Sequence, residues 1–176
     1  MKVHAVLAVM SAMLCDTVYG AQLQVEVRID VQRGCQLVGI TRNAGIEQLG
    51  VLDFGSGPRL DDPAGPLSAA LISQRQPRLE CNPDTPYQVR IDGGLHGGVG
   101  EVRYLATTTS SSSKPIPYRI YTDAARRTPL AVDVPVSGRV PDSGSVDLPL
   151  YGRIEPLKDI PRVGHYSDLL KVTVTW

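Results

Sequence analysis

Residue types that could perform catalysis stand together once in this chain, in the segment His165-Tyr166-Ser167-Asp168. A nucleophilic serine needs a histidine base within reach of its hydroxyl and a carboxylate that orients the histidine. Here the three types occupy nearly adjacent positions of one short segment, where a serine and its base can hardly converge. We interpret the segment as a turn before the last strand, and we predict no catalytic residues and no enzymatic activity.

A glycine-rich stretch, residues 92–100, is the next candidate for chemistry. Its glycines at 93, 94, 97, 98 and 100 do not have the spacing of a phosphate-binding loop, and no helix pattern follows them. We expect these glycines to supply positive φ angles in a hairpin or loop. The sequence predicts no cofactor and no metal site.

The chain has three cysteines, and Cys15 falls inside an expected export leader, which leaves Cys35 and Cys81. In an oxidising compartment such a pair normally forms a disulfide. The closed loop would restrict the unfolded chain by roughly 4 kcal/mol. A metal site or a redox pair is the alternative, but neither cysteine has another Cys or a His at close spacing. We predict a Cys35–Cys81 disulfide.

The first twenty residues have the pattern of a secretory signal peptide. Lys2 gives a positive start, residues 3–14 are apolar except for two positions, and small residues precede an expected cleavage site before Ala21. The apolar run is too short to span a bilayer, and no second run follows. We therefore predict residues 1–20 as a leader, and an exported chain with no membrane span.

The amino-acid composition narrows the possible folds and binding partners. Lys plus Arg (18) equals Asp plus Glu (18), so the chain lacks the basic excess that nucleic-acid binding favours. Gly (17) and Pro (14) are scattered so widely that a long uninterrupted helix has little room. The sequence predicts one all-β domain and no nucleic-acid partner.

Segment 22–32 has the most regular pattern in the chain, with apolar residues at every second position. Strict period two over ten residues predicts a strand with one buried face. Burying five such side chains contributes roughly 8 to 15 kcal/mol before the entropy of ordering is subtracted. The apolar residues are Leu23, Val25, Val27, Ile29 and Val31.

Shorter strand patterns follow, separated by Gly and Pro turns, and together they predict a β-sandwich. They cover residues 36–40, 50–54, 68–72, 77–81, 87–91, 102–106, 118–122, 131–136, 146–151 and 169–176. The last strand places Leu170, Val172, Val174 and Trp176 on one face, and the sequence ends there. A spare amphipathic strand at the start and a strand at the very end lead us to expect a sandwich that lacks one strand of its own and can complete a neighbour.

Several segments resemble the spore coat protein U domain family, which includes the pilins of archaic chaperone-usher fimbriae. The ending of the chain is the most specific, and the other segments support it. The segments are Leu150-Tyr151-Gly152-Arg153-Ile154, Gly164-His165-Tyr166-Ser167-Asp168, Val172-Thr173-Val174-Thr175-Trp176, Phe54-Gly55, Cys81 with Pro86-Tyr87, and Pro117-Tyr118-Arg119-Ile120-Tyr121-Thr122-Asp123.

This resemblance implies an incomplete immunoglobulin-like β-sandwich that is completed by a donor strand from a neighbouring subunit. Residues 21–34 would carry the donor strand (Leu23, Val25, Val27, Ile29 and Val31), and residues 35–176 the pilin domain. The edge formed by Leu170, Val172, Val174 and Trp176 would accept it. The implied partners are identical or related pilin subunits, a periplasmic chaperone and an outer-membrane usher. The implied place is a cell-surface fimbria, reached through the periplasm, with a role in adhesion and biofilm formation.

An alternative remains open at this stage. Segment 22–32 could be the first strand of a complete sandwich, and the chain would then be a self-complete secreted spore or cell-surface coat protein. The two hypotheses differ in one property, since a coat module should be stable alone and a donor-strand pilin should need its chaperone or a borrowed strand.

Overall fold

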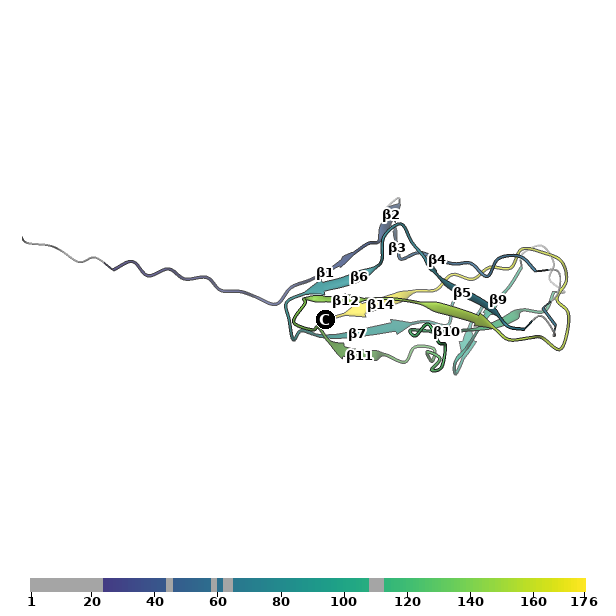
Figure 1. Ribbon diagram of the computed structural model, residues 1–176. Helices are drawn as coiled ribbons and strands as arrows, with labels where there is room; N and C mark the ends of the chain where they lie inside the picture. The colour runs from purple at the N-terminus through teal and green to yellow at the C-terminus, as the bar shows by residue number, and fades with distance from the viewer. Residues whose placement is uncertain (1–23, 44–45, 58–59, 62–64, 108–112) are drawn as a thin grey trace, which may run out of the picture. The chain divides into compact units, whose positions relative to one another are not determined.

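The computed structural model describes residues 24–43, 46–57, 60–61, 65–107 and 113–176. The expected leader and Leu23 lie outside these residues. The chain divides into two structural units, residues 1–31 and residues 32–176. In the first unit, residues 24–31 form neither helix nor strand, so the strand expected there is absent from the isolated chain. All regular structure described in the second unit is β-strand (Figure 1).

The strands form four antiparallel sheets, ordered β1-β6-β12, β4-β5-β13-β10-β9-β8, β11-β7-β14 and β2-β3. Their bounds are β1 (Cys35–Val38), β2 (Thr41–Asn43), β3 (Ile46–Gln48), β4 (Val51–Leu52), β5 (Leu67–Ile72), β6 (Arg78–Cys81), β7 (Pro86–Ile91), β8 (Gly98–Val99), β9 (Val102–Leu105), β10 (Ile116–Tyr121), β11 (Val136–Arg139), β12 (Ser145–Asp147), β13 (Tyr151–Ile154) and β14 (Val172–Thr175).

The core joins the β7 sheet to the six-stranded sheet. Ile91 of β7 is buried in one cluster with side chains from β10, β13 and the residue before β13. Apolar side chains that meet between two sheets define a sandwich. The all-β sandwich predicted from the sequence is therefore confirmed. The other buried members of the cluster are Ile116, Tyr118, Ile120, Leu150 and Ile154.

A glycine in the centre of β13 explains part of the Tyr-Gly-Arg-Ile motif. A Cβ on Gly152 would lie 2.5 Å from Cζ of Phe54, so the Phe54 ring occupies the place of the missing side chain. The same ring packs edge-on against Tyr118, with ring centroids 6.2 Å apart and planes at 66°. Gly152 is thus required for a close approach of an aromatic ring to the backbone.

Most predicted strands overlap an observed one, but two predictions are wrong in addition to the absent strand in the N-terminal segment. Residues 131–136 were expected as a strand, whereas Asp133 has a positive φ of 59° and β11 begins only at Val136. Residues 146–151 were expected as one strand, whereas the chain passes there from β12, which pairs with β6, to β13, which pairs with β5 and β10. Pro149 lies in that crossing, where no ladder amide is needed.

The β2-β3 hairpin was not predicted at all, whereas the glycine-rich stretch behaves as expected. Gly94, Gly97 and Gly100 have positive φ angles of 76°, 74° and 62°, and the stretch leads into the β8-β9 pair.

Candidate interaction groove

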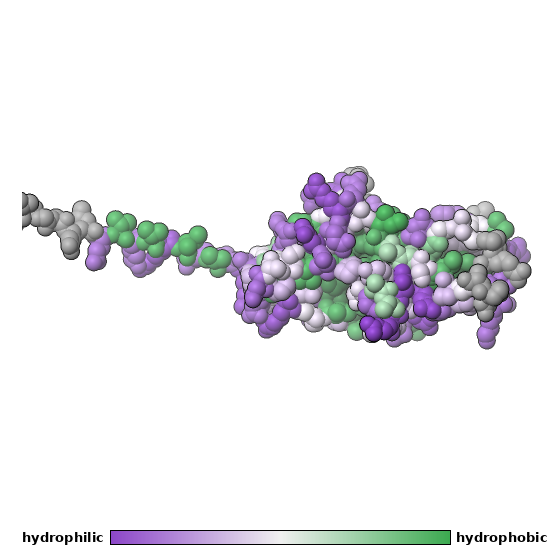
Figure 2. Space-filling view, in the orientation of Figure 1, coloured by the Kyte–Doolittle hydropathy of each residue, from purple (hydrophilic) through white to green (hydrophobic). Residues whose placement is uncertain are grey.

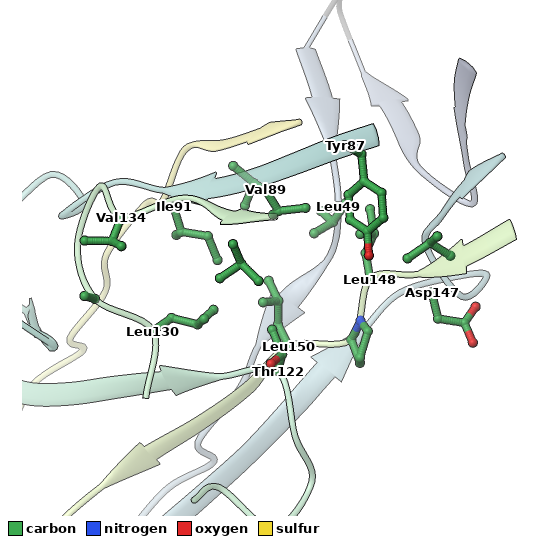
Figure 3. A pocket seen from close by; sticks show the side chains of 15 residues that line it. Leu49, Tyr87, Val89, Ile91, Thr122, Leu130, Val134, Asp147, Leu148 and Leu150 are labelled. Carbon is green, nitrogen blue, oxygen red and sulfur yellow. The ribbon is translucent and has the colours of Figure 1, made fainter. Parts of the chain in front are cut away.

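The feature that stands out in residues 32–176 is an apolar groove of about 260 Å³ between the β7 sheet and the chain around β12 and β13. Figure 3 shows side chains of β7 pointing into this space from one side and Leu130 and Leu150 pointing into it from another. The lining is almost entirely apolar. It consists of Leu49, Tyr87, Val89, Ile91, Thr122, Leu130, Ala131, Val134, Val136, Val146, Asp147, Leu148, Pro149, Leu150 and Val172.

The register of the sheet β11-β7-β14 explains why so many of these side chains face the groove. Val89 pairs with Val136 on one side and with Val174 on the other, and Ile91 pairs with Val172. Directly paired residues point to the same face of a sheet. Val174 therefore shares the groove face with its partners, which makes a continuous apolar floor.

Tyr87 covers one part of this floor because its partner on β11 has no side chain. A Cβ on Gly138 would lie 2.5 Å from the Tyr87 hydroxyl oxygen and 2.6 Å from Cζ. The tyrosine ring can therefore lie flat across β11 and form the groove wall at that place.

Strand β14 is an edge strand, and its hydrogen-bonding geometry shows where its free groups point. The amide of Asp92 donates to the carbonyl of Lys171 at 3.1 Å, next to the Val172–Ile91 pair. In an antiparallel ladder, residues that bond to the partner strand alternate with residues that bond to the opposite side. The backbone groups of Val172 and Val174 therefore point away from β7. No strand of the described ranges pairs with β14 on that side.

Two of the four residues expected on this edge lie outside the strand itself. Leu170 precedes β14 and packs, partly buried, against the core cluster. Trp176 follows β14 and is 56% exposed. The structure thus brings Val172 and Val174 together on the edge strand, with Leu170 and Trp176 flanking it.

The N-terminal unit carries a row of exposed apolar side chains. Val25, Val27, Ile29 and Val31 are between 76% and 89% exposed, an unusual state for a row of branched apolar side chains. Figure 2 shows apolar and polar residues alternating along this segment. On its polar side, Nε of Arg28 donates to Oε1 of Glu26 at 2.7 Å. The segment therefore presents a row of exposed apolar side chains.

Hydrogen bonds to other parts of the fold hold residues 167 and 168 in place. Ser167 exchanges two backbone hydrogen bonds with Ala106, at 2.9 and 3.1 Å. The Asp168 carboxylate accepts hydrogen bonds from the Tyr118 hydroxyl (2.7 Å) and from the backbone amides of Leu95 (2.8 Å) and Leu169 (2.9 Å). The aspartate holds the loop after β7 and the approach to β14 against β10, which is a structural role.

Tyr118 is the buried partner in this contact, with 4% of its surface exposed. Burial raises the pKa of its hydroxyl, and the hydrogen bond to the Asp168 carboxylate raises it further. A neutral hydroxyl can donate a hydrogen bond and a phenolate cannot. Because the raised pKa keeps the Tyr118 hydroxyl neutral, its hydrogen bond to Asp168 is intact at neutral pH.

A buried arginine supports the same region and was not foreseen from the sequence. Arg103 has no exposed surface, and its guanidinium donates to the carbonyls of Asp92 (2.8 Å), Leu130 (2.9 Å) and Ile91 (3.1 Å). Burial lowers the pKa of the guanidinium, and neighbouring acidic groups oppose that effect. Arg103 joins β9 to the end of β7 and to the segment before β11.

The predicted disulfide is present. Cys35 and Cys81 are bonded and sit opposite each other in the β1-β6 pair. The amide of Asn82 donates to the carbonyl of Gly34 just beyond them, which continues the ladder. The bridge thus fixes the start of the second unit to β6.

Most residues that line the groove were predicted from the sequence only as parts of strands. The alternation of Tyr87, Val89 and Ile91 predicted a buried face of the strand. The pattern cannot show that a groove, and not a fully packed core, lies against that face. Leu49 and Leu130 lie outside the strands and gave no periodic signal at all.

Two further searches of the described ranges bear on function. They contain no group of three or more His, Cys, Asp or Glu side chains placed to hold a metal ion. No helix within them is long and apolar enough to cross a membrane.

Comparisons with known proteins place the chain in a family. Among curated proteins none matches the sequence. A solved complex of a CsuC chaperone with a CsuE tip adhesion subunit, from archaic chaperone-usher Csu pili of Acinetobacter baumannii, matches with 18% identity and a TM-score of 0.47. The match covers 83% of this chain and 40% of that one. The model of the Spore Coat Protein U domain matches residues 21–173, and the chain therefore belongs to the Spore Coat Protein U domain family.

Proposed function

We propose that this protein is a structural subunit of a chaperone-usher pilus that polymerises by donor-strand complementation. The N-terminal segment of one copy inserts along β14 of the next copy, and its apolar side chains enter the groove. The linkage runs head to tail, so it generates an open fibre instead of a closed ring.

One observation carries this proposal. The described chain holds an exposed row of alternating apolar residues and, in the other unit, an apolar groove beside an edge strand with free backbone groups. An extended peptide that joins a sheet edge gains main-chain hydrogen bonds, and pockets for alternate side chains give specificity. Burying four branched side chains contributes roughly 6 to 12 kcal/mol before ordering is subtracted.

The same reasoning supplies the partners. An exposed sheet edge beside an open apolar groove promotes unwanted pairing. A periplasmic chaperone would cover it until an outer-membrane usher passes the subunit to the fibre. We place the assembled protein on the cell surface as a fimbria, with roles in adhesion and biofilm formation, and we assign it no enzymatic activity.

The test moves the segment within the chain. Two periplasmically expressed variants lack residues 21–33, and one of them carries that segment after Trp176 through a short flexible linker. If the fold lacks a strand, the relocated segment should raise the unfolding temperature markedly. A matched control carries the same appended segment with Val27→Asp and Ile29→Asp, which should remove the gain.

The opposite result is equally informative. If both variants unfold at the same high temperature, the sandwich is complete without the segment. The proposal would then fail, and a self-complete secreted coat protein would be the better description.

A further inference from the structure

We propose that an ion pair between Asp30 of one copy and Lys171 of the next sets the register in which two copies of this chain join. This inference rests on the proposed function, since it concerns the same groove and the same segment. It names the partner as a second copy of this chain and states which residues face each other.

The direction of the incoming strand follows from the sheets already present. Every strand pair in the described structure is antiparallel, and antiparallel pairing is the slightly more stable arrangement. An antiparallel strand on the free edge of β14 bonds to Val172 and Val174, whose backbone groups point there. Its residues opposite Lys171, Thr173 and Thr175 then occupy the non-hydrogen-bonded sites, where side chains come closest.

The charges on the segment single out one residue. Glu26, Arg28 and Asp30 share the polar face, and Glu26 and Arg28 already pair with each other. Asp30 is the remaining charge of that face, and no ion pair is found for it in the described residues. A single negative charge is thus available to a partner.

The outer face of β14 offers one matching charge. Its residues are Lys171, Thr173 and Thr175, of which only Lys171 is charged. On the neighbouring strand Arg90 stands opposite Thr173. Asp92 directly follows β7 and lies opposite Lys171. One of its carboxylate oxygens accepts hydrogen bonds from the backbone amides of Gly94 and Lys171. The Lys171 ammonium forms no ion pair among the described residues.

Placing Asp30 opposite Lys171 also keeps the apolar face of the segment inward. Ile29 then faces Val172 and Val27 faces Val174, so both valines of the acceptor strand receive a branched partner. Opposite Thr173, an uncharged residue, lies Arg28.

Only shifts by an even number of residues also keep the apolar face inward, and the charges then distinguish these registers. One shift by two residues places Arg28 opposite Lys171, which is repulsive. The other places Gln32 there and leaves Asp30 opposite Thr173. A shift by four in the first direction brings Glu26 to Lys171, but then Ile29 falls beyond the start of β14 and its burial is lost.

Cysteine cross-linking between two full-length copies reads the register directly. A Val27→Cys chain is mixed with chains that carry Val174→Cys, Val172→Cys or Trp176→Cys, and intermolecular disulfides are counted after mild oxidation. Paired residues in hydrogen-bonded sites lie about 5.5 Å apart, within reach of a disulfide. We expect the Val174→Cys partner to react best, and none of these substitutions alters a charge.

Charge reversal then tests the ion pair in the same assay. Asp30→Lys should lower the preference for Val174→Cys about three- to tenfold, as exchanging an exposed attraction for a repulsion does. Adding Lys171→Asp on the acceptor chain should restore it. Glu26→Lys makes the same change in net charge opposite Thr175. It removes the pair with Arg28 within the segment, but it should have little effect on the register, because no charged residue of the acceptor strand faces position 26.

The outcomes separate the two proposals. If wild-type chains neither associate nor cross-link at any position, the proposed function is wrong. If they cross-link best at Val172→Cys or Trp176→Cys, or if the preference for Val174→Cys ignores both charge reversals, the fibre stands and the Asp30–Lys171 pair is wrong.

Discussion

Replacing Gly152 by alanine should destabilise the second unit, because the new methyl group has no room. Its Cβ would lie 2.5 Å from Cζ and 3.0 Å from Cε1 of Phe54, well inside van der Waals contact. The backbone cannot withdraw, since Gly152 is paired with Ile120 on one side and with Ala69 on the other. The ring must move instead. Overpacking of this kind costs about 1 to 3 kcal/mol.

A second substitution provides the internal check. Phe54→Leu removes the ring, so it should cost stability alone but relieve the clash in the double variant. The destabilisation of Gly152→Ala with Phe54→Leu should then be smaller than the sum of the two single effects by at least about 1 kcal/mol. Urea unfolding of the oxidised full-length chain measures all four free energies of unfolding.

Gly34→Ala is the matched control, because no atom lies within 4 Å of the position of its Cβ and no positive φ is required there. It should change the free energy of unfolding by no more than about 0.5 kcal/mol. If Gly152→Ala behaves like Gly34→Ala, or if the double variant is simply additive, the steric reasoning is refuted.

Three further perturbations test the contacts that hold β14, β7 and β1 in place. Tyr118→Phe removes the hydrogen bond to the Asp168 carboxylate and should cost about 1.5 to 3 kcal/mol in urea unfolding near neutral pH. The pKa of Tyr118 is raised above its ordinary 10.0 in the folded state, so its contribution to stability is complete below pH 10 and is lost as the pH rises further. Above pH 10, the free energy of unfolding should therefore fall more steeply in the wild type than in Tyr118→Phe. Arg103→Met leaves the carbonyls of Asp92 and Leu130 without the guanidinium donor, whereas the Ile91 carbonyl keeps its hydrogen bond from the Asp133 amide. At about 1 to 3 kcal/mol for each carbonyl that loses its donor, the substitution should cost about 2 to 6 kcal/mol. Arg103→Lys should recover only part of this loss, and equal stability of the wild type and Arg103→Met would contradict the reasoning. Cys35→Ser with Cys81→Ser should lower stability by roughly 4 kcal/mol, and a thermal midpoint equal to that of the oxidised wild type would count against the loop-entropy argument.

The N-terminal segment shows what sequence alone can predict and where it stops. The period-two pattern of 22–32 puts the apolar residues on one side of an extended chain, because side-chain alternation is a local property of the chain. The same pattern predicts a strand, yet residues 24–31 form none in the isolated chain. A strand needs a partner edge, and whether that edge lies in the same molecule is not encoded within the segment.

The errors between residues 131 and 151 have a related cause. Val146 and Leu148 belong to one apolar run, but the first lies in β12 and the second in the passage between two sheets. A local pattern cannot show which sheet a residue joins, because that depends on distant strands such as β5 and β6. Arg103 was missed for the opposite reason, since a charged residue in a strand normally marks the solvent face, and only the fold reveals three carbonyls converging on it.

The contacts around β14 also bear on how favourable strand insertion would be. Asp168 fixes the approach to this strand through Tyr118 and Leu95, and Lys171 is bonded at its backbone to Asp92. These contacts therefore order the edge strand β14 within the chain itself. Ordering side chains and segments that are flexible in the free protein costs entropy, and this cost weakens association. That entropy would fall almost wholly on the N-terminal segment, so the affinity of one copy for the next would depend on the side chains of the segment and on the register they select.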